Sequence, residues 1–262
     1  MTGALLALLA CTPDADPASV LLVGNSYVQG QAVDDVVEGQ LARAEGAWAG
    51  GQAERLAAPN YSWQDHLAAL QDQAAWQQAL AATAGWEAVL LQEYSLVPGL
   101  PQDDSAWLSS LAALQALDAR VQAMGAETLL LQTWGRRDGS TELPDLYPDY
   151  GTMQALLVDG YQAYAAALAQ AGRSVRIAPA GQAFAAVREA EPDLFAALYS
   201  SDGSHLSAAG AFLVGCVVTE TMTSATCAGA ALPEGMTAAE GEILVQAADA
   251  VSLGQAAGQG TP

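Results

Sequence analysis

Lysine is absent from this sequence of 262 residues, so its eight basic residues are all arginine. The 29 acidic residues outnumber them and give a formal net charge of −21 at pH 7. Nucleic acids and anionic lipid headgroups are bound through clustered cations. The shortage of cations therefore argues against a protein that binds nucleic acids or membrane surfaces. The excess of acidic residues is more typical of a protein kept soluble by its net charge than of a binding site.

Long apolar runs are also missing, since none approaches the roughly 20 residues of a membrane span. The longest near the start, Ala4–Cys11, resembles the end of a bacterial lipoprotein signal, and a polar tether follows it. We therefore expect residues 1–18 to be signal and tether, Cys11 to carry a lipid, and the protein to be exported and anchored at a bacterial cell envelope. Because the run is short and no basic residue precedes it, a mis-assigned start or a plain N-terminal tail is the alternative.

Cysteine is scarce, and beyond Cys11 only Cys216 and Cys227 remain, eleven positions apart. Two such cysteines commonly pair in an exported protein, which predicts a disulfide that closes a short loop. Two separate buried thiols are the alternative. Neither cysteine lies in a CxxC motif or near a histidine, so the sequence predicts no metal and no cofactor.

Short apolar runs alternate with amphipathic segments along the chain. Val20–Val23 ends in Gly24, which is typical of a strand buried on both faces of a parallel sheet. Further strands are predicted at 55–58, 88–91, 128–131 and 175–178, and helices at 31–45, 63–83, 105–124, 153–171 and 208–221. This order predicts an α/β protein, a three-layer α/β/α sandwich around a flavodoxin-like parallel sheet. We expect one domain over 19–251 and a flexible tail at 252–262.

Ligands of open parallel sheets bind outside the carboxyl ends of the strands, so the residues after each strand are the candidates for a site. They form a polar and aromatic set with little positive charge, at 24–27, 59–62, 92–95, 132–135 and 179–181.

Only two histidines are present, His66 and His205, which limits any mechanism that depends on histidine. His205 follows Asp202 by three residues in a turn that contains Gly203. This spacing lets the Asp202 carboxylate reach the Nδ1 proton and leaves Nε2 free as a base. The pair alone is a weak signal, and it needs a nucleophile.

Ser26 supplies a nucleophile by position, because it follows a buried strand at the mouth of the first helix. A serine that only caps the helix is the alternative. The G-x-S-x-G elbow of α/β-hydrolases is not met, since Val28 replaces its second glycine.

These segments together resemble the SGNH hydrolase superfamily, the GDSL-like esterases, in a group whose first block reads G-N-S. The matching blocks are Leu21–Tyr27, Val89–Ser95 and Asp202–Gly210, with further likeness at Trp134 and at 178–183, and the resemblance spans about 19–223.

The resemblance implies a Ser-His-Asp triad of Ser26, His205 and Asp202. It also implies an oxyanion hole made by the Ser26 amide, a second-block glycine amide and a third-block asparagine side chain. Here Asn60 replaces that glycine and Gln92 replaces that asparagine. Both can still donate hydrogen bonds, so we expect Ser26, Asn60 and Gln92 to form the hole.

Several other residues are weaker candidates. Tyr94 and Trp134 are expected to contact a substrate, with packing as the alternative. Arg136 and Arg137 are the only adjacent cations in the sequence. They are expected either to contact an anionic substrate or simply to lie in a surface loop. His66 receives no chemical role.

The resulting prediction is a serine esterase that hydrolyses a short acyl ester, such as an O-acetyl group on a carbohydrate, through an acyl-enzyme. The alternatives are a non-catalytic glycan-binding or surface lipoprotein on the same fold, and an acyltransferase.

Overall fold

A computed structural model describes residues 17–258 of the protein, with side chains as far as Leu253. Cys11 and most of the predicted signal and tether lie outside the described residues. No helix within the described part of the chain is both long and apolar enough to cross a membrane.

The centre of the molecule is a sheet of five parallel strands in the order β2-β1-β3-β4-β5. The strands are β1 (Ser19–Gly24), β2 (Gln52–Ala57), β3 (Ala88–Leu91), β4 (Glu127–Leu131) and β5 (Val175–Ala178). All five were predicted, β3 and β5 with their observed bounds. The order of the strands reverses at β1, so the crevice where ligands of such sheets bind lies at the carboxyl end of β1.

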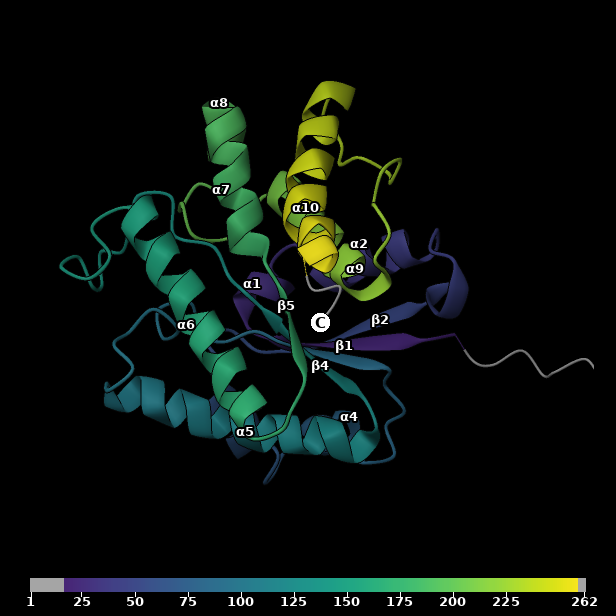
Figure 1. Ribbon diagram of the computed structural model, residues 1–262, viewed down its shortest axis with the longest axis vertical. Helices are drawn as coiled ribbons and strands as arrows, with labels where there is room; N and C mark the ends of the chain where they lie inside the picture. The colour runs from purple at the N-terminus through teal and green to yellow at the C-terminus, as the bar shows by residue number, and fades with distance from the viewer. Residues whose placement is uncertain (1–16, 259–262) are drawn as a thin grey trace, which may run out of the picture.

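Helices cover both faces of the sheet (Figure 1), which confirms the three-layer α/β/α class. One layer holds α1 (Ser26–Gln29), α2 (Val33–Leu41), α7 (Ala180–Ala190), α8 (Pro192–Ala197), α9 (Ala208–Thr223) and α10 (Ala238–Gly258). The other holds α3 (Trp63–Ala69), α4 (Ala74–Ala79), α5 (Ser105–Met124) and α6 (Tyr150–Gln170). Alternate residues of β1 feed the two cores, with Val20 and Leu22 on one side and Leu21 and Val23 on the other.

The long helix predicted at 63–83 is wrong, because the chain bends between α3 and α4. The peptides of Gln71, Asp72 and Gln73 form tight turns back to Ala68 and Ala69. The alanine- and glutamine-rich sequence contains no glycine or proline there to signal the break. The bend lets Trp76 of α4 donate a hydrogen bond to His66 of α3.

The C-terminal part also differs from expectation. Helix α10 was not predicted, and it continues past Ser252, so the expected start of the tail falls inside a helix. It packs on α9 and α7, and Leu244 and Ala248 are buried in the core there.

Candidate active site

Ser26 lies at the carboxyl end of the strand where the sheet order reverses. β1 ends at Gly24, Asn25 caps α1, and Ser26 is the first residue of that short helix. The Asn25 side-chain oxygen accepts a hydrogen bond from the Tyr27 amide at 3.1 Å. This cap turns the chain sharply after the strand, so the Ser26 side chain is left half-buried at the edge of the sheet.

A chain of hydrogen bonds joins Ser26 to the loop before α9. Ser26 Oγ lies 2.8 Å from His205 Nε2, and His205 Nδ1 lies 2.6 Å from Asp202 Oδ2. The other Asp202 oxygen accepts bonds from the Ser204 and His205 amides at 2.8 and 2.9 Å and from the Ser200 hydroxyl at 2.8 Å. The structure thus brings together the three residues that the sequence assigned to a triad.

The electrostatics of the pair suit a base at His205. Partial burial raises the pKa of Asp202, but the hydrogen bonds from His205, the two amides and Ser200 outweigh it and hold the pKa far below its usual range. The carboxylate is therefore ionised at neutral pH and accepts the Nδ1 proton. In the neutral ring, Nε2 is then the unprotonated nitrogen that faces Ser26.

Tyr27 and Trp134 hold the histidine loop in place. The Tyr27 hydroxyl lies 2.7 Å from Ser204 Oγ, and the Trp134 indole donates to the Ser204 carbonyl at 3.0 Å. Trp134 is fully buried, stacked between Tyr27 and Phe184 with ring centroids 4.7 and 5.1 Å away. Its predicted contact with a substrate is wrong, because both of its faces are covered. The sequence analysis assigned no role to Tyr27 or Ser204. The only sequence signal for them is that each is adjacent to a predicted triad residue, Ser26 or His205.

Asn60 lies in the loop next to the nucleophile, with an exposed side chain and a left-handed φ of 64°. Asn25 Nδ2 donates to the carbonyl of the next residue, Tyr61, at 2.9 Å. Asparagine tolerates the left-handed region better than most residues, so it can adopt a backbone conformation that otherwise favours glycine. Its role as an amide donor remains a prediction.

Gln92 lies beneath the nucleophile loop, where its side chain is fully buried. Its oxygen accepts the Asn25 amide proton at 2.9 Å, and its nitrogen donates to the Glu93 carbonyl. These backbone partners fix the orientation of the carboxamide. The predicted contact with an oxyanion is therefore wrong in this structure, because a group without exposed surface cannot reach a bound substrate.

Tyr94, by contrast, remains a candidate for substrate contact. It is half-buried and packs beside the small core cluster around Tyr147.

His66, on α3, is completely buried. Its Nε2 lies 3.0 Å from the Gly24 carbonyl, and its Nδ1 accepts from the Trp76 indole at 2.9 Å. Burial lowers the pKa of His66 to about 4, so the ring is neutral at physiological pH.

Glu93 is a second buried group behind the site that sequence reasoning missed. Its carboxylate accepts from the amides of Trp63 and Tyr94 at 3.1 and 2.6 Å and from Ser110 Oγ at 2.5 Å. Burial raises its pKa to about 7 despite these bonds. It ties the loop after β3 to α3 and α5.

Arg136 and Arg137 are already engaged in ion pairs. Arg136 pairs with Glu142 at 2.7 Å, and Arg137 pairs with Asp138 at 2.9 Å. The Arg137 amide donates to the Gly203 carbonyl at 2.8 Å, so this segment supports the histidine loop.

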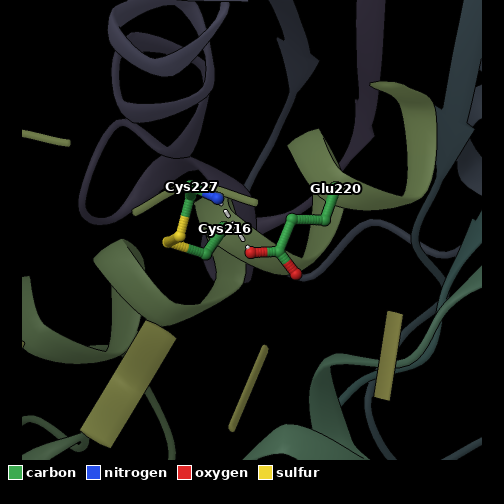
Figure 2. Close-up of side chains that lie close together, drawn as sticks. All are labelled: Cys216, Glu220 and Cys227. Atoms are coloured by element: carbon green, nitrogen blue, oxygen red, sulfur yellow. Dashed lines mark hydrogen bonds between the residues drawn. A yellow bond between two sulfur atoms is a disulfide. The ribbon is translucent and has the colours of Figure 1, made fainter. Parts of the chain in front are cut away.

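The described residues contain one group with metal-ligand chemistry, Cys216, Glu220 and Cys227. Figure 2 shows that the two sulfurs are bonded to each other, which is the predicted disulfide. The Glu220 carboxylate accepts a hydrogen bond from the Cys227 amide at 3.1 Å. With the thiols joined, this group has no thiolate to offer a metal.

Comparisons with known proteins agree on the architecture. No family model matches the chain. No curated protein matches it either. A candidate SGNH hydrolase from Slackia heliotrinireducens is similar over 79% of this chain and 100% of its own, with 24% identity and a TM-score of 0.61. A DUF4886 family protein from Bacteroides uniformis is similar over 90% and 95%, with 19% identity and a TM-score of 0.71.

An acetyl xylan esterase, AlAXEase, is similar over 76% of this chain and 97% of its own, with 12% identity and a TM-score of 0.53. At these identities the likeness concerns the arrangement of the backbone. The parallel sheet and these solved structures together show that the chain has the fold of the SGNH hydrolases.

Proposed function

We propose that this protein is a serine esterase that hydrolyses short acyl esters through an acyl-enzyme. The hydrogen-bonded chain from Ser26 through His205 to Asp202 carries this proposal. A serine hydroxyl is a weak nucleophile unless a neighbouring base removes its proton, and a base works best when a third group fixes its orientation. All three roles have a residue at hydrogen-bonding distance here.

The reaction proceeds in two halves. Ser26 Oγ attacks the acyl carbon while His205 Nε2 takes its proton, and the resulting tetrahedral oxyanion receives hydrogen bonds from the Ser26 and Asn60 amides. The intermediate collapses as His205 returns the proton to the departing alcohol, which leaves an ester on Ser26. Water then attacks this ester with His205 again as the base, and the acid departs.

The substrate we propose is an O-acetyl or similar short acyl group on a carbohydrate. The His205 and Asp202 side chains are 41% and 48% exposed, so the triad lies at an open surface that a bulky alcohol such as a glycan can approach. The solved structure of an acetyl xylan esterase on the same fold supports the same class.

Covalent labelling with a fluorophosphonate probe tests the chemistry. The wild type should react at Ser26, and Ser26→Ala should lose both labelling and nearly all hydrolysis of p-nitrophenyl acetate while remaining folded. Ser174→Ala, an exposed serine at the opposite edge of the sheet, is the matched control. A folded wild type that neither labels nor hydrolyses would leave the glycan-binding alternative. Transfer of the acyl group to an added sugar in preference to water would indicate the acyltransferase.

We further propose that the protein is exported and carries a lipid on Cys11. The Ala4–Cys11 pattern supports this. Expression in a bacterial host, followed by detergent phase partition and mass spectrometry, should find a lipidated form in wild type and not in Cys11→Ser. An unmodified, complete N-terminus in wild type would contradict it.

A further inference from the structure

The peptide unit directly before the nucleophile is held from both sides. Its carbonyl, on Gly24, lies 3.0 Å from His66 Nε2 and also accepts from the Ala58 amide at 3.4 Å. Its N–H, on Asn25, donates to Gln92 Oε1 at 2.9 Å. His66 comes from α3 and Gln92 is the residue after β3, so two separate elements hold one planar group.

We infer that His66 and Gln92 are positioning residues, which clamp the Gly24–Asn25 peptide and so fix the attack geometry of Ser26. The effect of this clamp on catalysis rests on the proposed function. Since the peptide is planar, holding its carbonyl and its N–H leaves little freedom for rotation at this point of the chain. Ser26 follows at the next residue, so its direction depends on this plane.

The tautomer of His66 is fixed by its other partner. The Trp76 indole can only donate, so Nδ1 must be the unprotonated nitrogen and Nε2 must carry the proton. Nε2 therefore donates to the Gly24 carbonyl. The aromatic ring of Tyr61 also packs against the His66 ring, with 5.3 Å between the ring centroids. This packing helps to exclude water from the bond between His66 and Gly24.

Gly24 is required for the other half of the clamp. A Cβ atom at this position would lie 2.5 Å from Gln92 Oε1 and 2.9 Å from a Val28 methyl. Only glycine lets the carboxamide come close enough to accept the Asn25 proton. The glycine of the G-N-S block therefore has a packing role in this chain, besides any role in the turn.

Catalytic rates are sensitive to small displacements of a nucleophile, and a shift of about 1 Å can cost about 100-fold. His66→Leu removes the donor to Gly24 and keeps an apolar side chain of similar bulk. We expect kcat for p-nitrophenyl acetate to fall about 10- to 100-fold with KM within about twofold. His66→Gln, whose carboxamide can donate to Gly24 and accept from Trp76, should restore most of the rate.

The control is Leu70→Ala, a buried truncation at the C-cap of the same helix, which leaves the backbone bond from the Leu70 amide to the His66 carbonyl in place. It should lower the melting temperature and leave kcat nearly unchanged. If His66→Leu lowers kcat no more than Leu70→Ala does, the positioning role is refuted. Should His66→Leu fail to fold, Gln92→Leu tests the clamp from its other side, because it removes the acceptor of the Asn25 amide. It should then lower kcat severalfold, and an unchanged kcat refutes the role.

A readout independent of activity separates this inference from the proposed function. Nitrogen-15 NMR of the two histidines should show His66 as the Nε2–H tautomer, and hydrogen exchange should find the Asn25 amide protected. Exchange at Asn25 should become at least 10-fold faster in His66→Leu and not in Leu70→Ala. An Nδ1–H tautomer, or unchanged exchange, overturns the clamp even if the protein is an esterase. An inactive wild type with the expected exchange overturns only the proposed function.

Discussion

The hydroxyl groups of Tyr27 and Ser204 lie 2.7 Å apart, although 177 residues separate them in the sequence. Tyr27 follows the nucleophile directly, and Ser204 precedes the histidine directly. Their bond therefore joins the two halves of the site one residue away from the reacting atoms. Stacking of Tyr27 on the buried Trp134 gives this link a rigid base.

Tyr27→Phe tests this link, because it removes one hydroxyl and keeps the stacked ring. Stability should fall by about 1 kcal/mol, the usual value of a single hydrogen bond. kcat should fall severalfold, since the loop with His205 gains freedom, and KM should change little. Urea unfolding and steady-state kinetics on the same preparation measure both effects. An unaltered kcat would show that the Trp134 bond to Ser204 suffices.

Asn25→Asp tests the contribution of the asparagine in the G-N-S block. The Asn25 side chain caps Tyr27 with its oxygen and donates to Tyr61 with its nitrogen. A carboxylate keeps the cap but places an oxygen against the Tyr61 carbonyl, which leaves a part-buried acceptor without its donor. We expect a loss of about 1–3 kcal/mol in unfolding free energy.

The Asn25→Asp variant should also lower kcat, because the loop with Asn60 is held through Tyr61. Asn60→Ala leaves the amide in place and serves as the comparison for the exposed side chain. A stable Asn25→Asp variant with full activity would mean that the loop is held by other contacts.

Glu93→Gln tests the buried carboxyl behind the site through the pH dependence of stability. Its pKa is raised from 4.5 to about 7 by burial. The unfolded chain therefore releases this proton at lower pH than the folded chain does. The stability that the protonated group contributes is fully present below pH 4.5 and is lost as pH rises to about 7.

The wild type should lose about 3 kcal/mol of unfolding free energy over this pH range through Glu93. Glu93→Gln should abolish this part of the pH dependence of stability. Urea midpoints of both proteins between pH 4.5 and 8 give the difference. Burial also shifts the pKa values of Glu220 (raised) and His66 (lowered), and their contributions cancel because both proteins contain them. Parallel curves for the two proteins would show that Glu93 is ionised in the folded state throughout.

Removal of the disulfide tests whether the far end of α9 affects the site. The bridge closes a loop with a sequence separation of 11 residues. Cys216→Ala with Cys227→Ala should lower stability by about 2–3 kcal/mol, because a short loop gains chain entropy in the unfolded state. kcat should stay within about twofold, because His205 lies beyond the opposite end of the helix. A large fall in kcat would instead couple the two ends of α9.

Most of the fold was predictable because a buried parallel strand leaves a plain trace in the sequence. The strands β3 and β5 were placed to the residue, and β4 and β1 nearly so. Helix breaks left no such trace. The bend between α3 and α4 brings Trp76 to His66, and local helix propensity does not encode such a contact.

The triad was predictable from local motifs, since Ser26 follows a strand and Asp202 and His205 share one turn. The direction in which a side chain points could not be predicted in this way. Gln92 occupies the position expected of an oxyanion donor, yet its carboxamide turns inward to Asn25 because that amide is buried and needs an acceptor. Trp134 likewise follows a strand of the sheet but packs into the core.

The direction of β1 decides which way the site faces. The six residues of this strand carry the chain about 20 Å from the amino edge of the sheet to the edge where Ser26 lies. With the proposed lipid on Cys11, the tether would meet the domain at the edge opposite the site. The enzyme would then present Ser26 outward, toward polymers in the surroundings, and away from the bilayer that holds it.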